Sequence, residues 1–142
     1  MRQIKFRAKD KDKNWICGDL IHGVGEYNGS IFILPISKNL NNIPNCDPIN
    51  GVLIDENTIC QFTRLFDDNR KEIYEGDIIQ SLENDKSIYI IVYDDEFCSF
   101  KAHQIHCKYG VYCSISQDWI WETDKVIIGN VFDNQELLND TL

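Results

Sequence analysis

The sequence lacks any long uninterrupted apolar stretch. A membrane-spanning helix needs about 18 or more apolar residues in a row, and no run in this chain approaches that length. The first ten residues are basic, but no apolar segment follows them, so the sequence predicts no secretory signal peptide. We therefore expect a protein that makes no membrane contact and lies in the cytoplasm.

The chain also lacks the closely paired cysteines of common zinc and redox motifs. None of its six cysteines forms a C-x-x-C pair, and their spacing is irregular. Without a secretion signal, an even count of cysteines is a poor argument for disulfides. We interpret the cysteines as reduced thiols, most of which fill the core, and the sequence predicts no cofactor. They are Cys17, Cys46, Cys60, Cys98, Cys107 and Cys113.

Positive charge is scarce. The chain has 14 Lys and Arg against 23 Asp and Glu, a net charge of -9. Residues 1–15 hold six bases and two acids, a local charge of +4, so the rest of the chain sums to -13. A strongly acidic body repels phosphate, which disfavours a general nucleic-acid binder. The balance suits a soluble protein, a partner with a basic face, or a DNA mimic.

The N-terminal part of the chain reads as short strands. Its 142 residues, 43% of them hydrophobic, fit one domain or a barrel with an attached sub-domain. Residues 4–9 (IKFRAK) alternate between apolar and basic side chains, which predicts a half-buried strand whose bases are solvated. Asn28-Gly29 predicts a hairpin with a type I′ turn. Pro44 and Pro48 exclude regular structure from a loop near 37–51, which we expect to be mobile.

The C-terminal part continues the β pattern. Asp55 is placed to cap one helical turn through Asn57, before the chain extends again. From residue 72 onward, short β-rich runs alternate with turn residues, which suggests an antiparallel sheet curled into a barrel. The segment DNQELL predicts a final helical turn capped by Asp133 or Asn134.

Three blocks of the sequence resemble the YopX family, small proteins of phages and prophages in bacteria. They are IKFRAKD at the start, ENTICQFTRLFDDNRKEIYEGDII in the middle and VIIGNVFDNQELL at the end, in the order that the family has them. Lys9 stands at a usual tryptophan, and Cys60, Arg64 and Arg70 stand at usual glycines. The resemblance implies a phage-encoded, mainly β protein with an SH3-like barrel over 64–142. It carries over no activity and no catalytic residues.

The stretch EIYEGDII (72–79) crowds three carboxylates around one glycine. A left-handed Gly76 and a hydrogen-bonding Asp77 are typical of a tight turn that leads into a strand. Glu75 and Asp77 also form a carboxylate pair suited to acid–base work. No nucleophile, oxyanion motif or metal-ligand partner accompanies that pair, so we interpret Gly76 and Asp77 as a structural turn and expect no catalytic residue.

His103, His106 and Cys107 form the one metal-like cluster. Cys98 or Cys113 would complete a zinc site, but residues 103 and 106 face opposite ways on a strand, and paired-ligand spacing is missing. The acidic runs 67–72 and 93–97 lack the D-x-D-x-D-G pattern of calcium loops. We therefore expect no metal, and interpret the acidic runs as solvated turns.

Trp119 and Trp121 fall on one face if WIWETDKVIIGNVF is a strand. Such a pair suits the core, a stacking platform for bases or an oligomer contact, and the acids beside it argue against nucleic acid. Binding candidates are therefore these tryptophans and the bases of the first strand: Arg2, Lys5, Arg7, Trp119 and Trp121.

The sequence as a whole predicts one YopX-like domain, with a β-rich N-terminal part (1–63) and an SH3-like part (64–142). We expect a non-enzymatic interaction module that binds a host or phage protein in the bacterial cytoplasm. The alternatives are an accessory nucleic-acid factor that uses the bases of Arg2 to Lys13, and an enzyme that uses Glu75 and Asp77. Exposed strand edges and paired aromatics also invite self-association.

Overall fold

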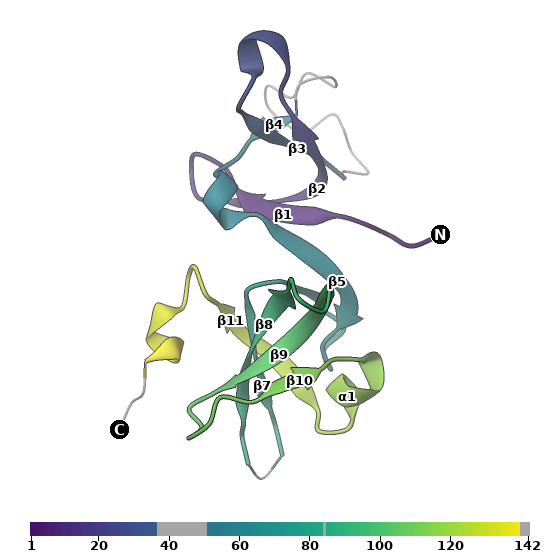
Figure 1. Cartoon of the computed structure of the whole chain (residues 1–142), viewed down its shortest axis with the longest axis vertical. Helices are drawn as coiled ribbons and strands as arrows, with labels where there is room; N and C mark the ends of the chain where they lie inside the picture. Colours follow the sequence, from purple (N-terminus) through teal and green to yellow (C-terminus); the bar gives the residue numbers. More distant parts are fainter. Residues whose placement is uncertain (37–50, 84, 140–142) are drawn as a thin grey trace. The chain divides into compact units, whose positions relative to one another are not determined.

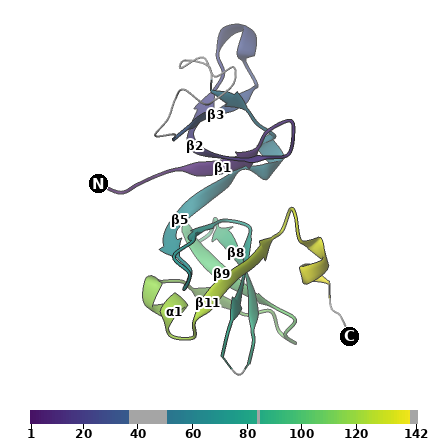
Figure 2. The same ribbon diagram turned by 180° about the vertical axis from the view of Figure 1, so that it is seen from behind.

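The computed structural model describes residues 1–36, 51–83 and 85–139, and these are mainly β (Figures 1 and 2). The described strands form two antiparallel sheets, as the sequence predicts. The chain divides into two compact units, Met1–Phe62 and Thr63–Leu142, and the boundary lies within strand β5 (Cys60–Phe66). The loop expected near 37–51 and Cys46 fall outside the described residues, except for Gly51.

The first unit is built on strands in the order β4-β3-β2-β1-β5. The β1 strand pairs on one side with β2, where Ala8 lies opposite Ile16, and on the other with β5, where Arg7 lies opposite Cys60. Ala8, Ile33 and Ile54 form its buried core. The strands other than β5 are β1 (Phe6–Lys9), β2 (Trp15–His22), β3 (Ile31–Pro35) and β4 (Val52–Leu53).

The basic face of β1 is not the solvated surface that the alternation predicts. Lys5 is only 9% exposed, and its Nζ lies 4.6 Å from the ring centre of Phe62. The guanidinium of Arg7 lies 4.6 Å from the ring of Trp15, and Lys9 Nζ lies 5.2 Å from the same ring. A long basic side chain covers an aromatic ring with its stem and places its charge over the π face. Alternation gives the two faces of a strand, but not what covers each face.

Local turn chemistry in the first unit is partly as predicted. Asp55 caps the 3-10 turn η3 (Glu56–Thr58), with its carboxylate accepting from the Asn57 N–H over 3.0 Å. β2 and β3 form the expected hairpin, but its turn is not type I′: Asn28 has φ -57° and Gly29 φ 88°. The Ser30 N–H donates to the Tyr27 carbonyl over 3.0 Å, so positive φ is needed at Gly29 alone, as in a type II turn.

The second unit contains a five-stranded sheet in the order β10-β9-β8-β7-β11. A closed barrel is not found among the described residues, because β10 and β11 are the outer strands of this sheet. Its core is the cluster Ile73, Ile79, Tyr89, Ile91, Ala102 and Ile120. The strands are β6 (Glu72–Tyr74), which lies next to β5, and β7 (Asp77–Ser81), β8 (Ile88–Asp94), β9 (Ser99–Ile105), β10 (Tyr112–Ser114) and β11 (Lys125–Asn130).

The segment expected to be a strand with Trp119 and Trp121 on one face is a short helix, α1 (Gln117–Trp121). The hydroxyl of Ser116 caps it by accepting from the Trp119 N–H over 3.1 Å. Residues two apart on a helix are separated by about 200° around the axis. Trp119 therefore packs edge-on against Tyr89, with ring centres 5.2 Å apart, whereas Trp121 is 55% exposed.

The chain end forms the expected helical turn, η4 (Gln135–Leu138). Asn134 occupies the capping position, but its side chain makes no capping hydrogen bond. Its Oδ1 instead accepts from the Asn130 N–H over 3.2 Å, which fixes the chain as it leaves β11.

Candidate functional site

A pocket in the second unit lies where β5 ends and α1 begins. Its volume is about 540 Å³. β5 and the turn that follows supply four of its lining residues, and α1 supplies the other two. The lining residues are Phe66, Asp67, Asp68, Arg70, Gln117 and Trp121.

The pocket is held together by Gln117, the first residue of α1. Its Nε2 donates to the Phe66 carbonyl over 2.7 Å, and its Oε1 accepts from the Phe66 N–H over 3.0 Å. The Ser116 cap fixes where the helix begins, and so places this amide against β5. Both backbone groups of Phe66 are satisfied by one side chain, which sets the position of the Phe66 ring relative to α1.

The floor of the pocket is anchored by Asp67, which is 1% exposed. One carboxylate oxygen accepts from the Lys71 N–H over 2.8 Å, and the other accepts from the Ile127 N–H over 3.0 Å. The carboxylate thereby ties the β5–β6 turn to β11. This acid belongs to one of the runs interpreted as solvated turns, and that interpretation is wrong for Asp67.

The walls of the pocket are aromatic and accessible. Phe66 is 39% exposed and Trp121 55% exposed, although both are large apolar side chains. Asp68 and Arg70 add one negative and one positive charge at the rim. Neither of these charged side chains has a hydrogen-bond or ion-pair partner within the described part of the chain. The pocket is therefore equipped to bind through apolar contact and charge.

The carboxylates of EIYEGDII lie outside the pocket, in β6, in the turn that follows it and at the start of β7. Gly76 has φ 81°, its N–H donates to the Ile91 carbonyl over 2.8 Å, and its carbonyl accepts from the Val131 N–H over 2.9 Å. Asp77 is 1% exposed, and its Oδ2 accepts from the Tyr74 N–H over 2.8 Å. The Asp77 carboxylate therefore stabilises the turn between β6 and β7 by accepting a backbone hydrogen bond.

The histidines of the metal-like cluster are engaged separately. His103 stacks on Tyr112 with ring centres 4.3 Å apart, and His106 Nε2 lies 2.9 Å from the Leu137 carbonyl. Across residues 1–36, 51–83 and 85–139, no three His, Cys, Asp or Glu side chains are grouped to hold a metal ion. The five described cysteines are reduced thiols: Cys60 is buried, but Cys17 and Cys98 are exposed, so those two do not fill the core.

Cys107 lies in a distinctive backbone setting. The N–H of Val111, together with those of Gly110 and Tyr109, favours the thiolate and lowers the pKa of Cys107 below its ordinary value of 9.0. The thiol also lies 3.4 Å from the Gln104 carbonyl. Cys107 is therefore a more acidic thiol than an unperturbed cysteine.

The predicted binding residues are divided between the two units and have separate surroundings. Arg2 is exposed near the N-terminus, and Lys5 and Arg7 lie on aromatic rings of the first unit. Trp119 is partly buried under Lys125, whose Nζ lies 4.1 Å from its ring centre and donates to its carbonyl over 2.8 Å. Burial lowers the pKa of Lys125, and nearby acids, Glu122 foremost, oppose that shift. Only Trp121 belongs to the pocket.

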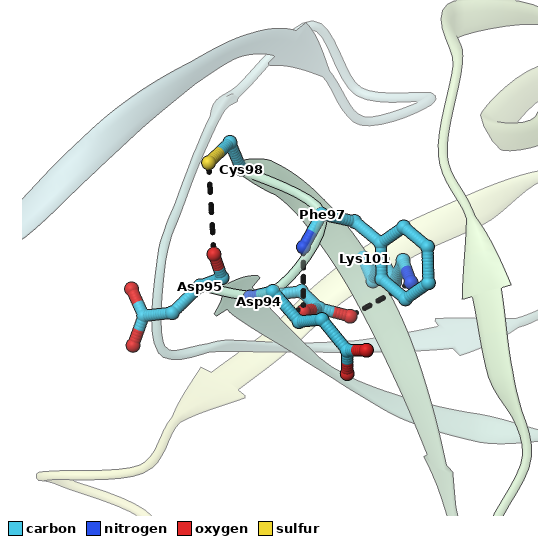
Figure 3. A network of polar contacts seen from close by, with 6 residues as sticks. Asp94, Asp95, Phe97, Cys98 and Lys101 are labelled. Carbon is cyan, nitrogen blue, oxygen red and sulfur yellow. Dashed lines mark hydrogen bonds and ion pairs between the residues drawn. The ribbon is translucent and has the colours of Figure 1, made fainter.

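A second exposed aromatic side chain lies at the tip of the β8–β9 hairpin. Phe97 is 65% exposed, and Lys101 Nζ lies 3.9 Å from its ring centre (Figure 3). Asp94 joins the two: one carboxylate oxygen lies 2.7 Å from Lys101 Nζ, and the other accepts from the Phe97 N–H over 3.2 Å. The hydrogen bond from Lys101 lowers the pKa of Asp94. The ion pair, the hydrogen bond and the ring contact hold Asp94, Phe97 and Lys101 together at this tip.

Sequence reasoning missed Phe66, Asp68, Arg70 and Gln117 as a group. Phe66 and Gln117 are 51 residues apart, and no local pattern reports their contact. One signal was available: Ser116 followed by Asp118 is typical of a helix start. This pattern predicts a helix that begins at residue 117, and it gives Gln117 a capping or packing role.

The fold and pocket define a mainly β protein of two units, with a pocket in the second unit that is lined in part by Phe66 and Trp121. The sequence model of the YopX protein family matches residues 5–139, and the chain belongs to that family. The crystal structure of protein EF1440 from Enterococcus faecalis is similar, with a TM-score of 0.57 and 22% identity, over 98% of this chain and 100% of that one. No protein with a curated description shows significant sequence similarity to the present chain.

Proposed function

We propose that this chain is a non-enzymatic protein-interaction module that binds a host or phage protein in the bacterial cytoplasm. One observation carries the proposal: two large aromatic side chains, Phe66 and Trp121, are exposed in the walls of one pocket. Exposed aromatics held in a fixed pocket are typical of the few residues that supply most of the energy of a protein interface.

The rigidity of the pocket supports the same proposal. Gln117 fixes Phe66 through two hydrogen bonds, and Asp67 ties the adjacent turn to β11. A preformed pocket loses little conformational entropy on binding, so more of its contact energy appears as affinity. Within residues 1–36, 51–83 and 85–139, no helix has the length and apolar character needed to cross a membrane.

The basic strand does not add support for a nucleic-acid factor. Lys5, Arg7 and Lys9 already lie on aromatic rings, which reduces their freedom to meet phosphates. Self-association stays a prediction. It is measured directly by sedimentation equilibrium of the purified chain, and β10 and β11, the outer strands of the sheet, are the first edges to test.

The proposal is tested with a tagged chain in a nuclease-treated lysate of infected host cells, followed by affinity measurements on the purified partner. Trp121→Ala is expected to weaken binding of that partner about 30-fold, as for an interface anchor worth about 2 kcal/mol. The matched control is Phe97→Ala, which removes another exposed ring of the same unit, 65% exposed against 55% for Trp121, outside the pocket. Equal loss in both variants, or none in Trp121→Ala, contradicts the proposal.

A further inference from the structure

Trp121 differs from the other two tryptophans in what lies on its ring. The guanidinium of Arg7 lies 4.6 Å from the ring centre of Trp15, and Lys125 Nζ lies 4.1 Å from that of Trp119. Within the described part of the chain, no Lys or Arg lies over the ring of Trp121, whose side chain is 55% exposed. The face of an indole ring is electron-rich and attracts cations. Trp121 is therefore open to a cation from another molecule.

The pocket that Trp121 lines is more acidic than basic. Among its lining residues, Asp67 and Asp68 are acids and Arg70 is a base. Both oxygens of the buried Asp67 carboxylate accept from neutral backbone N–H groups. No Lys or Arg side chain of the described residues forms an ion pair with Asp67. Its negative charge therefore acts at the pocket without an ion pair to offset it.

The segments that form the pocket add further negative charge. Residues 64–72, on the β5 side, hold three bases and three acids, whereas residues 117–124, which include α1, hold three acids and no base. Asp118 and Glu122 are exposed, and each directly follows a lining residue of α1, so neighbouring Cα atoms are about 3.8 Å apart. Charges this close are only partly screened at physiological ionic strength, where the screening length is about 8 Å. The charge around the pocket therefore favours a cationic ligand over an anionic one.

We propose that the pocket takes a basic side chain, an Arg or a Lys, from the partner protein. The cation lies against the ring of Trp121, its apolar stem packs on Phe66, and the exposed Asp68 supplies an opposite charge. Arg70 carries a like charge and weakens this binding, so its removal is expected to strengthen it. This assignment rests on the proposed function, because it names the ligand of the same pocket.

The test uses three capped tripeptides as probes: Gly-Arg-Gly, Gly-citrulline-Gly and Gly-Glu-Gly. Each is titrated into the nitrogen-15-labelled full chain, and the indole N–H signal of Trp121, assigned by its absence in Trp121→Phe, is followed by NMR. Citrulline has nearly the shape of arginine but no charge. We expect the Arg probe to have a Kd about fivefold below that of the citrulline probe, as for one exposed cation–π contact or ion pair. The Glu probe is expected to bind most weakly.

Two variants of the pocket give opposite expected results. Asp68→Asn raises the Kd of the Arg probe about threefold, and Arg70→Gln lowers it about twofold, while the citrulline probe is unaffected by either change. The matched control is Asp95→Asn, which removes an exposed acid of the same unit outside the pocket and changes the total charge as Asp68→Asn does. It is expected to leave the Kd of the Arg probe unchanged. All three residues are exposed and lie between strands, so the fold is expected to survive each change.

The inference is overturned if the citrulline or the Glu probe binds as tightly as the Arg probe, if Asp68→Asn has no more effect than Asp95→Asn, or if no probe moves the Trp121 signal. It is also overturned if a short oligothymidylate, whose bases stack on aromatic rings, moves that signal at lower concentration than the Arg probe. Failure here is distinct from failure of the proposed function. A partner whose binding is lost in Trp121→Ala but unchanged in both Asp68→Asn and Arg70→Gln refutes the basic ligand and keeps the interaction module.

Discussion

The side-chain amide of Gln117 pairs with both backbone groups of Phe66, its Nε2 donating over 2.7 Å and its Oε1 accepting over 3.0 Å. In a β-sheet, a neighbouring strand usually supplies one N–H donor and one carbonyl acceptor to such a residue. Here one side chain of α1 supplies both, so the end of β5 is satisfied without another strand. These two hydrogen bonds therefore join α1 to the end of β5, where Phe66 lines the pocket.

Gln117→Leu is expected to lower the free energy of unfolding by about 1–2 kcal/mol, because two hydrogen bonds of modest net value are lost near the surface. The change is measured by urea denaturation followed by tryptophan fluorescence. Glu122→Gln, an exposed change at the other end of α1, is the control and is expected to stay within about 0.5 kcal/mol. Equal effects of the two substitutions would show that the Gln117 bridge adds no stability.

Asp67→Asn is expected to be more costly, at about 2–4 kcal/mol. The two Asp67 oxygens accept from the N–H groups of Lys71 and Ile127, and the side chain is buried. Asparagine keeps one acceptor but turns an amide donor toward the other N–H, which leaves a buried donor unsatisfied. Asp68→Asn, one residue away and exposed, is the matched control. A loss of under about 0.5 kcal/mol in Asp67→Asn would contradict the anchoring role.

Arg64→Gly and Arg70→Gly are each expected to stabilise the protein by about 0.5–1 kcal/mol. Glycine relieves a left-handed strain of about 1–2 kcal/mol and loses about 0.5–1 kcal/mol through the greater freedom of the unfolded chain. Both arginines have positive φ, whereas Lys71 does not. Lys71→Gly therefore has only the entropic cost, and the expected change in its melting temperature is of opposite sign. A lower melting temperature in the two arginine variants would refute the strain argument.

Local chemistry made the strands and several turns predictable. Asp55 caps its helical turn through Asn57, because a side-chain carboxylate two residues before an orphan N–H needs no distant partner. The alternation of residues 4–9 likewise marks β1, since successive side chains of a strand point to opposite faces. These signals lie within a few residues of the structure that they specify.

Features that depend on contacts between distant residues could not be predicted from local sequence patterns. The charge of Lys5 is covered by Phe62, which lies far along the chain, so the alternation predicts a solvated face where Lys5 instead lies on an aromatic ring. Trp119 and Trp121 fit a strand by alternation, but the Ser116 cap decides for a helix. The pocket itself depends on the contact of Gln117 with Phe66, and the SH3-like barrel expected from the family resemblance has no closure among the described strands.

Cys107 is expected to react with iodoacetamide at a lower pH than an ordinary cysteine. The thiolate is the nucleophile: its sulfur forms a bond to the methylene carbon and iodide leaves. Backbone N–H groups, that of Val111 first, lower the pKa of Cys107 from 9.0, so at neutral pH more of it is thiolate in the folded chain than in the unfolded chain.

The rate of Cys107 alkylation, read by peptide mass spectrometry across pH, is therefore expected to reach half its plateau below pH 9.0 in the native protein. The same cysteine in concentrated urea is the control, because unfolding removes the ordered N–H groups and returns the pKa to its ordinary value. A thiolate with a lower pKa is also a weaker nucleophile. The plateau rate of alkylation is therefore expected to be lower in the native protein, while the midpoint moves to lower pH. Superimposable native and denatured profiles would show that the loop does not stabilise the thiolate.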